Sequence, residues 1–269
     1  MKIISEMISF PQDSSDNPDS SSFSNMGVHA CMVCESQAFK YIDKDLWLSH
    51  DEIAGIRMVN SEKLLNAKKI VLVLNLDNTL LHTTKEKRHL KTPEEVMKHT
   101  NKYNDSLISL KSLGMMTKLR PYVHTFLEEA STMFEMYIYT TGDRRYASIM
   151  AQFLDPKEVY FKSRIIARED LVDPEKMSVD LVLRHKRMVL ILNDNENVWR
   201  YDDDDKSNVF HVQKYHYFDS RLDRSIVSLS ALNNDEREIN GVLATLLKGL
   251  KRIHTMLFNP KFEGGLDFK

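Results

Sequence analysis

The sequence predicts an α/β fold in which helices cover a parallel sheet. Three runs of apolar and β-branched residues lack the alternation of a half-exposed strand, at residues 69–75, 136–140 and 188–192. Such runs are typical of strands that are buried on both faces of a parallel sheet. Helical patterns lie between the runs, and this order implies strand-helix-strand units with helices on both faces of the sheet.

The helices are predicted from their first turns and their apolar faces. Two acids within residues 51–54 favour a helix start, because they would lie at the positive end of the helix dipole. Pro121 suits the first turn of the next helix, and Asp143 is expected to cap a helix that continues to Phe153. A long apolar face predicts a last helix over residues 235–257.

Two further expectations concern the segments between these elements. Short strands are predicted at residues 159–161 and 165–166, where β-branched and aromatic residues gather. The stretch from 83 to 118 is polar with mixed signals. We expect it to form a small surface insertion after the first strand of the sheet.

Composition indicates one large domain with short flanking segments. The chain has 269 residues, of which 42% are hydrophobic and 28% charged, enough for a sizeable core. Residues 1–28 form a Ser-rich tail that we expect to be disordered. Residues 29–66 are predicted to be a lead-in segment, residues 67–258 the main domain, and residues 259–269 a C-terminal tail.

The charge and the apolar runs exclude several classes of protein. With 37 basic and 39 acidic residues, the net charge of −2 leaves no basic excess, so we expect no direct nucleic-acid partner. The longest apolar run, residues 70–74, is too short to cross a bilayer, and we expect no membrane partner. The N-terminus lacks a secretory signal pattern, and the two cysteines cannot build a disulfide framework. We therefore expect a soluble intracellular protein.

Polar clusters follow all three apolar runs and carry the strongest functional signal. They lie at Asn75–Thr79, Thr140–Asp143 and Asn193–Glu196. Ligands of open α/β sheets bind beyond the carboxyl ends of the strands, where these clusters would meet. The competing interpretation is that Asp and Asn simply end strands and cap helices.

Carboxylates at such strand ends would suit phosphate-ester chemistry. One carboxylate would attack phosphorus, and a second would protonate the leaving oxygen. Mg²⁺ would neutralise the phosphate, because it prefers carboxylate and carbonyl oxygens and keeps several waters. The Thr140 hydroxyl would hold a phosphate oxygen, and Asp194 would complete the metal shell.

Several segments resemble one known family of phosphatases. The segment LVLNLDNTLLHT at residues 72–83 is similar to the signature strand and turn of the haloacid-dehalogenase superfamily. More specifically, the chain resembles the RNA polymerase II C-terminal-domain (CTD) phosphatases, of the TFIIF-associating type and its plant CTD-phosphatase-like branch. Further segments that resemble this branch are residues 31–57, 115–156, 159–171, 189–199, 214–218 and 247–258.

The resemblance implies a haloacid-dehalogenase-like, Rossmann-type domain with a small insertion after the first strand. It also implies Mg²⁺ as cofactor and dephosphorylation of protein phosphoserine through an aspartyl phosphate. The partner would be a phosphorylated Ser-Pro-rich tail such as the RNA polymerase II CTD, and the location would be nuclear.

The first family motif, Asp-x-Asp-x-Thr, is only partly kept in this chain. The resemblance places the nucleophile and metal-ligand position on Asn75, whose neutral amide cannot form the aspartyl phosphate. It places the general acid/base, whose backbone carbonyl also faces Mg²⁺, on Asp77. The phosphate-binding hydroxyls fall on Thr79 and Thr140.

Two later positions of the family pattern are altered as well. The family's lysine, which neutralises the phosphate and the nucleophile, falls on Met177, and Lys176 would take this role after a one-residue backbone adjustment. The family's pair of aspartates falls on Asn193 and Asp194, so the implied metal positions are Asn75, Asp77, Asn193 and Asp194. Because two of these changes remove negative charge beside the metal, the Mg²⁺ affinity should fall.

Three functions are compatible with these residues. The first is a pseudophosphatase that binds a phosphorylated or unphosphorylated Ser-Pro-rich tail without hydrolysing it. The second is a weakly active Mg²⁺-dependent protein serine phosphatase in which Asp77 or Asp194 activates a water. The third is a scaffold without catalysis or phosphate binding. Hydrolysis of phosphate monoesters needs an enhancement of up to ~10²¹, so the loss of the nucleophile favours the first.

Four other features leave two interpretations open. Cys31 and Cys34 are half a zinc site or free thiols. The acidic run 202–205 is an extra cation site or a solvated loop, and the aromatic run 215–218 is a substrate-facing patch or part of the core. The arginine pair 144–145 contacts a phosphate or is surface charge at a helix start.

Overall fold

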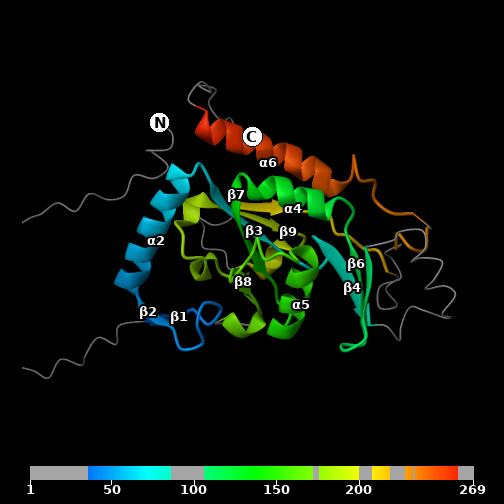
Figure 1. The fold of residues 1–269 in the computed structure, drawn as a ribbon, viewed down its shortest axis with the longest axis horizontal. Coiled ribbons are helices and arrows are strands. Elements are labelled where there is room, and N and C mark those ends of the chain that lie inside the picture. Colours follow the sequence, from blue (N-terminus) through cyan, green and yellow to red (C-terminus); the bar gives the residue numbers. More distant parts are fainter. Residues whose placement is uncertain are drawn as a thin grey trace, which may run out of the picture.

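A five-stranded parallel sheet forms the centre of the protein (Figure 1). The structure is a computed structural model that describes residues 36–85, 106–171, 176–199, 208–218, 228–232 and 234–259. The strands of the sheet are β3 (Ile70–Leu74), β7 (Phe134–Tyr139), β8 (Ile165–Ile166), β9 (Val189–Asn193) and β10 (Val209–His211). All neighbouring strands pair in parallel, which confirms the predicted fold class.

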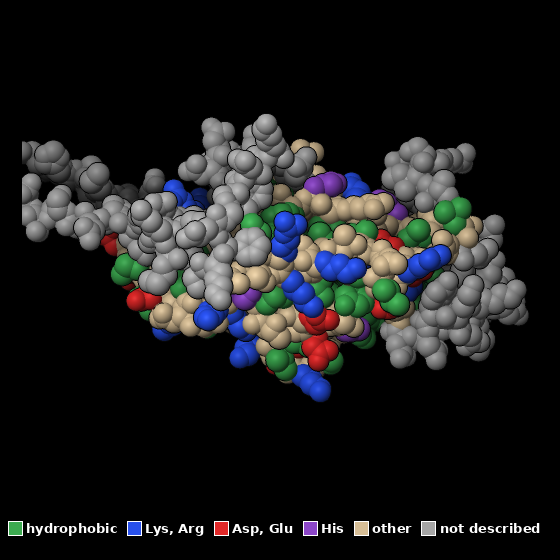
Figure 2. Space-filling view, turned by 90° about the horizontal axis from the view of Figure 1, so that it is seen from above, with side chains coloured by type: hydrophobic (Ala, Val, Ile, Leu, Met, Phe, Trp, Pro, Cys, Tyr) green, Lys and Arg blue, Asp and Glu red, His purple; other side chains and the backbone are tan. Residues whose placement is uncertain are grey.

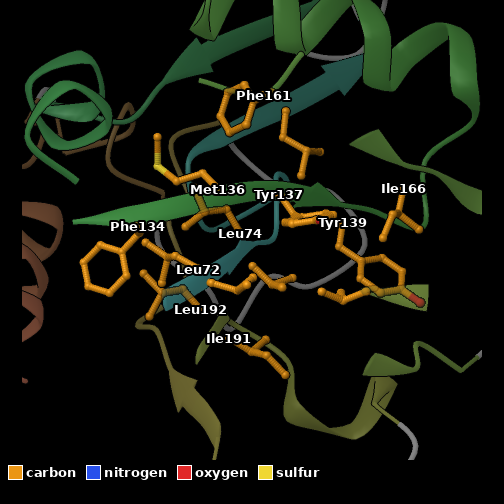
Figure 3. Close-up of a cluster of buried hydrophobic side chains, with 14 of the residues drawn as sticks. Leu72, Leu74, Phe134, Met136, Tyr137, Tyr139, Phe161, Ile166, Ile191 and Leu192 are labelled. Carbon is orange, nitrogen blue, oxygen red and sulfur yellow. The ribbon is translucent and has the colours of Figure 1, made fainter. Parts of the chain in front are cut away.

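The central strand β3 explains why the sheet is visible in the sequence. All five of its residues are buried, and it pairs with both β7 and β9. Figure 3 shows Leu72 and Leu74 among the side chains of β7 and β9, and Phe161 belongs to the same cluster of buried side chains. Burial on both faces therefore requires an uninterrupted apolar run.

The strand order places a topological switch point beside β3. Along the chain the sheet grows from β3 to β7 and β8, and then returns to β9 and β10 on the other side of β3. In open α/β sheets such a reversal leaves a crevice at the carboxyl ends of the strands. The predicted polar clusters follow the carboxyl ends of β3, β7 and β9.

Helices cover the sheet on both sides (Figure 1). They are α2 (His50–Asn66), α4 (Val123–Ser131), α5 (Arg144–Leu154) and α6 (Val242–Phe258). Helix α2 begins with a capping box between Ser49 and Glu52, and Asp143 caps α5 by accepting from the Tyr146 N–H (2.8 Å). Helix α6 packs on α4, while α5 lies across the sheet from them.

The strand predicted at residues 159–161 is wrong. The N–H groups of Val159, Tyr160 and Phe161 donate to the two carboxylate oxygens of Asp155 at 2.6–2.9 Å. Because one buried carboxylate satisfies these donors, the segment has no need of a strand partner.

The last helix begins at Val242, so the prediction from residue 235 is also wrong. Gly241 is its N-cap, and the Glu236 carboxylate accepts from the Val242 N–H (3.2 Å). Ile239, which falls within the helix predicted over residues 235–257, is 78% exposed. The segment before the helix is held instead by ion pairs, which are described below.

The insertion after β3 is a second, antiparallel sheet rather than a purely polar surface element. Its strands are β4 (Leu81–Lys85), β5 (Leu107–Leu110) and β6 (Met115–Leu119), in the order β4-β6-β5. Met116 of β6 packs with Tyr215, Tyr217 and Phe218 in a separate buried cluster. The run 215–218 therefore belongs to the core.

Residues Ser36–Ala38 (β1) and Trp47–Ser49 (β2) form a short antiparallel pair ahead of α2. Short 3₁₀ turns lie at Arg168–Asp170, Val179–Leu181, Lys186–Met188 and Glu196–Val198. The expectations for residues 1–28, for Cys31 and Cys34, for the run 202–205 and for residues 260–269 lie outside the described residues.

The surface on the side of α6 mixes basic, acidic and apolar side chains (Figure 2). Among the described residues, no helix combines the length and the apolar character needed to cross a membrane.

Candidate functional site

The loop after β3 carries the first polar cluster and has a defined shape. The Asn75 N–H donates to the carbonyl of Leu192 in β9 (3.0 Å), so this residue continues the sheet. The Leu80 N–H donates back to the carbonyl of Leu76 (2.9 Å), and both leucines are fully buried. Asn78 takes a left-handed φ of 59°, which asparagine tolerates better than most residues. The turn is thereby anchored in the core.

The Asn75 side chain joins two of the three strand ends. Its amide nitrogen Nδ2 lies 2.8 Å from the backbone carbonyl of Asp77, 2.8 Å from Asp194 Oδ1 and 3.4 Å from Thr79 Oγ1. The Thr79 hydroxyl also donates to Asp194 Oδ1 (3.3 Å). Asn75, Asp77, Thr79 and Asp194, which we call the strand-end cluster, thus form one hydrogen-bonded group.

The Asp77 carboxylate is held by a chain of hydroxyl groups. Tyr146 of α5 donates to Asp77 Oδ1 (2.7 Å), and its hydroxyl also lies 2.6 Å from Thr83 Oγ1 of β4. Thr83 in turn contacts Thr117 of β6 (2.8 Å). Burial raises the pKa of Asp77 to about 6, the Tyr146 hydrogen bond opposes this rise, and the nearby Asp194 charge adds to it. Asp77 can therefore exchange a proton near neutral pH.

Thr140 lies at the end of β7 with a hydroxyl proton available for a ligand. Its side chain is buried, and its Oγ1 accepts from the Gly142 N–H (3.0 Å), so that within the described ranges the hydroxyl hydrogen remains able to donate to a ligand. A Cβ at Gly142 would lie 2.7 Å from the Tyr146 ring and 3.3 Å from Thr140 Oγ1. Glycine is therefore needed here because Tyr146 packs directly on this turn.

The two altered positions outside the first motif contact each other. Met177 and Asn193 are each 1% exposed, and Asn193 Nδ2 lies 3.9 Å from Met177 Sδ. Asn193 Oδ1 accepts from the Asn195 N–H (2.8 Å), so the amide is oriented by its own loop. The resemblance predicts a lysine and an aspartate at these positions, whereas this chain has a neutral pair.

Lys176 does not join the strand-end cluster. It is exposed, and its ammonium donates to the carbonyl of Asn197 (3.2 Å). The Met177 N–H donates to the carbonyl of Val198 (2.7 Å) and fixes the register of this segment. A one-residue adjustment that brought Lys176 to the site would break this hydrogen bond.

Arg120 is a buried cation that ties the loop after β3 to two distant segments. Its guanidinium donates to the carbonyls of Thr79 (3.0 Å) and Gln213 (2.9 Å). It also forms a bidentate pair with Glu236, at 3.1 and 2.6 Å. Next to it, Lys118 pairs with Asp235 at 3.1 Å, and both side chains are almost fully buried. These two ion pairs hold the segment before α6, where the sequence predicts a helix.

The sequence does not single out Tyr146 or Arg120 as site residues. It offers Arg144 as a phosphate contact instead. Arg144 pairs with Asp170 and donates to the carbonyl of Ile165 (2.6 Å), so its guanidinium is committed to the fold. Tyr146 lies one helical turn from the Asp143 cap, and this position at the start of α5 is the signal that could have found it. Nothing in the local sequence singles out Arg120.

The oxygen atoms of the strand-end cluster are partly suited to a divalent cation. The Asp77 carbonyl and an Asp194 oxygen converge on one point, and both are ligand types that Mg²⁺ prefers. The Asn75 Nδ2 group lies at that point, and a cation would require its amide to turn and present the oxygen. Asn193 faces Met177 and Asn195 instead. Within the described ranges, no group of three or more His, Cys, Asp or Glu side chains has the arrangement of a metal site.

Curated proteins similar to this chain include two RNA polymerase II CTD phosphatase-like proteins of a plant. The chain is 45% identical to "RNA polymerase II C-terminal domain phosphatase-like 4" of Arabidopsis thaliana, over 90% of this chain and 57% of that protein. It is 33% identical to "RNA polymerase II C-terminal domain phosphatase-like 3" of the same plant, over 76% of this chain and 17% of that protein. The chain thus spans little more than half of the first relative and a smaller part of the second.

A solved structure and a family profile agree with these relatives. The structure of Fcp1, described as an essential RNA polymerase II CTD phosphatase, matches with a TM-score of 0.59 and 22% identity, over 75% of this chain and 66% of that one. At this identity the match concerns the fold, and it confirms the haloacid-dehalogenase-like architecture. The profile of "NLI interacting factor-like phosphatase" matches residues 70–242, from the start of β3 to the start of α6. The parallel sheet, the strand-end cluster and the insertion all fall within this match, and the chain belongs to the NLI interacting factor-like phosphatase family.

Proposed function

We propose that this protein is a pseudophosphatase that binds a phosphorylated Ser-Pro-rich tail, such as the RNA polymerase II CTD, without hydrolysing it. The observation that carries the proposal is the state of Asn75 at the position of the family's nucleophile. Its amide is neutral, and its NH₂ group is engaged with Asp77 and Asp194. An amide oxygen cannot attack phosphorus to give the acyl phosphate that the family reaction requires.

The charges around the cluster define how a phosphate would be held. Asp77 and Asp194 are the carboxylates here, while Met177 stands where the resemblance predicts a lysine. Two carboxylates would repel a phosphate dianion, so binding requires a counter-charge. Mg²⁺ supplies this charge when it is bound, and Asp194 with the Asp77 carbonyl would hold it. The hydroxyls of Thr79 and Thr140 would donate to phosphate oxygens.

Mg²⁺ affinity should be weak without a phosphate. Magnesium sites with one or two carboxylates commonly rely on phosphate oxygens to complete the coordination. We therefore expect cation and phosphopeptide to bind together. Lys176 would add to this site only if its segment gave up the hydrogen bond between Met177 and Val198. The relatives' link to RNA polymerase II supports a nuclear location.

A second candidate function is a slow Mg²⁺-dependent protein serine phosphatase. The observation in its favour is Asp77, whose raised pKa of about 6 makes it a suitable base for a water near neutral pH. A scaffold without phosphate binding is the third candidate, and phosphopeptide affinity separates it from the first.

The test is phosphate release from a phosphorylated CTD heptad peptide with Mg²⁺. It compares the native chain with Asp77→Ala, with Asn75→Asp, and with the triple variant that adds Met177→Lys and Asn193→Asp. The proposal expects a silent native chain that binds the phosphopeptide, and turnover in the triple variant. Native turnover well above that of Asp77→Ala would instead support the slow phosphatase. A native chain that neither releases phosphate nor binds the peptide would support the scaffold.

A further inference from the structure

The orientation of the Asn75 amide is dictated by its neighbours. The Asp77 backbone carbonyl and the oxygens of the Asp194 carboxylate accept hydrogen bonds. An amide that turned its oxygen toward them would place three acceptors together, so the NH₂ group must face them at 2.8 Å each. In this orientation the amide occupies the point on which the metal-binding oxygens converge.

We propose that the Asn75 amide takes the place of the divalent cation in this chain. It bridges the Asp77 carbonyl and Asp194 as a cation would, and holds the loop after β3 against the loop after β9. A cation then enters only together with a phosphate, after the amide has turned to present its oxygen. This second step rests on the proposed function, while the first step stands on the geometry alone.

The hydrogen bonds explain why a cation alone would gain little. Asp194 Oδ1 already accepts from Asn75 and Thr79, and the Asp77 side chain is held by Tyr146. A hydrated Mg²⁺ sheds its waters reluctantly and would have to displace the amide for one carboxylate and one carbonyl. A phosphate that arrives with the cation adds further oxygen ligands, and it accepts from hydroxyls such as that of Thr140.

The family's aspartate at this position would behave in the opposite way. An Asn75→Asp change replaces two donors by a carboxylate that faces Asp194 and the Asp77 carbonyl. The three oxygens would repel one another until a cation bound between them. The variant should therefore be less stable than the native chain without divalent cations, and should regain stability when Mg²⁺ is added.

The test compares three proteins by thermal unfolding and by Mg²⁺ titration in a calorimeter. They are the native chain, Asn75→Asp, and the matched control Asn60→Asp, which makes the same chemical change in α2, where Asn60 contacts the Leu183 carbonyl. We expect Mg²⁺ alone to leave the unfolding temperatures of the native chain and the control unchanged. It should raise that of Asn75→Asp, with Mg²⁺ affinity at least about tenfold tighter than native. Equal affinity for Mg²⁺ in the native chain and Asn75→Asp would overturn the proposal.

A second measurement on the native chain avoids any folding defect of the variant. The side-chain NH₂ signals of Asn75 are identified in ¹⁵N-asparagine-labelled protein by their absence in Asn75→Ala. Mg²⁺ alone should leave them in place, and Mg²⁺ with the phosphopeptide should shift them. A shift with Mg²⁺ alone contradicts the first step. If the phosphopeptide does not bind at all, the proposed function fails, while the response to Mg²⁺ alone still decides the role of the amide.

Discussion

The contact between Met177 and Asn193 allows a direct test of whether the altered positions are coupled. Both side chains are buried and neutral, and their polar atoms lie 3.9 Å apart. Met177→Lys or Asn193→Asp alone would introduce an ionisable group without a counter-charge at this contact. Together they would create an ion pair at the positions where the resemblance predicts a lysine and an aspartate.

The loss in free energy of unfolding that each single change causes cannot exceed the cost of keeping the new side chain uncharged. At pH 7, keeping the new carboxyl group of Asn193→Asp protonated costs about 4 kcal/mol, because its ordinary pKa is about 3.9. Keeping the new amine of Met177→Lys neutral costs about 5 kcal/mol, from an ordinary pKa of about 10.4. At a separation of about 4 Å and an effective dielectric constant of about 20, the pair gains about 4 kcal/mol. With both groups charged, the double variant should therefore lose less than the sum of the single changes, by up to about 4 kcal/mol.

The assay is urea unfolding of the native chain, both single variants and the double variant at pH 7 with a chelator. Met177→Leu, a neutral change of similar volume, serves as the control and should cost less than about 1.5 kcal/mol. The denaturant slopes must agree between variants for the free energies of unfolding to be compared. Additivity of the two single changes within about 0.5 kcal/mol would refute the coupling.

Three further predictions concern the surroundings of the cluster. The pKa of Asp77 is raised from 3.8 to about 6, so the folded protein holds this proton more tightly than the unfolded chain does. The free energy of unfolding should therefore fall as the pH rises from about 4 to about 6. Without divalent cations, Asp77→Asn should be more stable than the native chain at pH 8 by about 3 kcal/mol, and urea unfolding should show no such pH dependence for this variant. Gly142→Ala should cost about 1–3 kcal/mol in thermal unfolding, because its Cβ would lie 2.7 Å from the Tyr146 ring, and most of this cost should be absent in a Tyr146→Ala background. Arg120→Ala should destabilise by about 3 kcal/mol because it removes a buried cation and leaves the partly buried Glu236 carboxylate unpaired, and the double variant with Glu236→Ala should recover part of that loss in the same assay.

The sheet can be predicted from the sequence because a strand that is buried on both faces requires an uninterrupted apolar run. A strand such as β3, covered on both faces, allows no polar residue along its length. The start of α5 is equally visible, because the Asp143 cap is a local feature. The meeting of Asn75 with Asp194 follows from the parallel arrangement of their strands. The chemical roles of these residues stay predictions.

The features that the sequence does not predict depend on contacts between side chains and distant partners, and these contacts leave no periodic pattern in the sequence. Residues 159–161 have strand-like composition, but the Asp155 carboxylate satisfies their N–H groups. The start of α6 is predicted too early because Glu236 pairs with Arg120 instead of entering the helix. Tyr146 reaches Asp77 only through the packing of α5 on the sheet. No periodicity in the chain encodes such pairings.

The ion pair between Arg120 and Glu236 also bears on the order in which the protein can form during synthesis. The two residues are separated by 116 positions, and the same guanidinium holds the Thr79 carbonyl. Chains emerge from the ribosome with the N-terminal part first. While residue 236 is still inside the ribosome, β3 and β7 can already pair, but Arg120, which holds the loop after β3, lacks its carboxylate partner. A nascent chain should therefore acquire its ligand-binding geometry only after residue 236 has left the ribosome, when β3 and β7 have already paired.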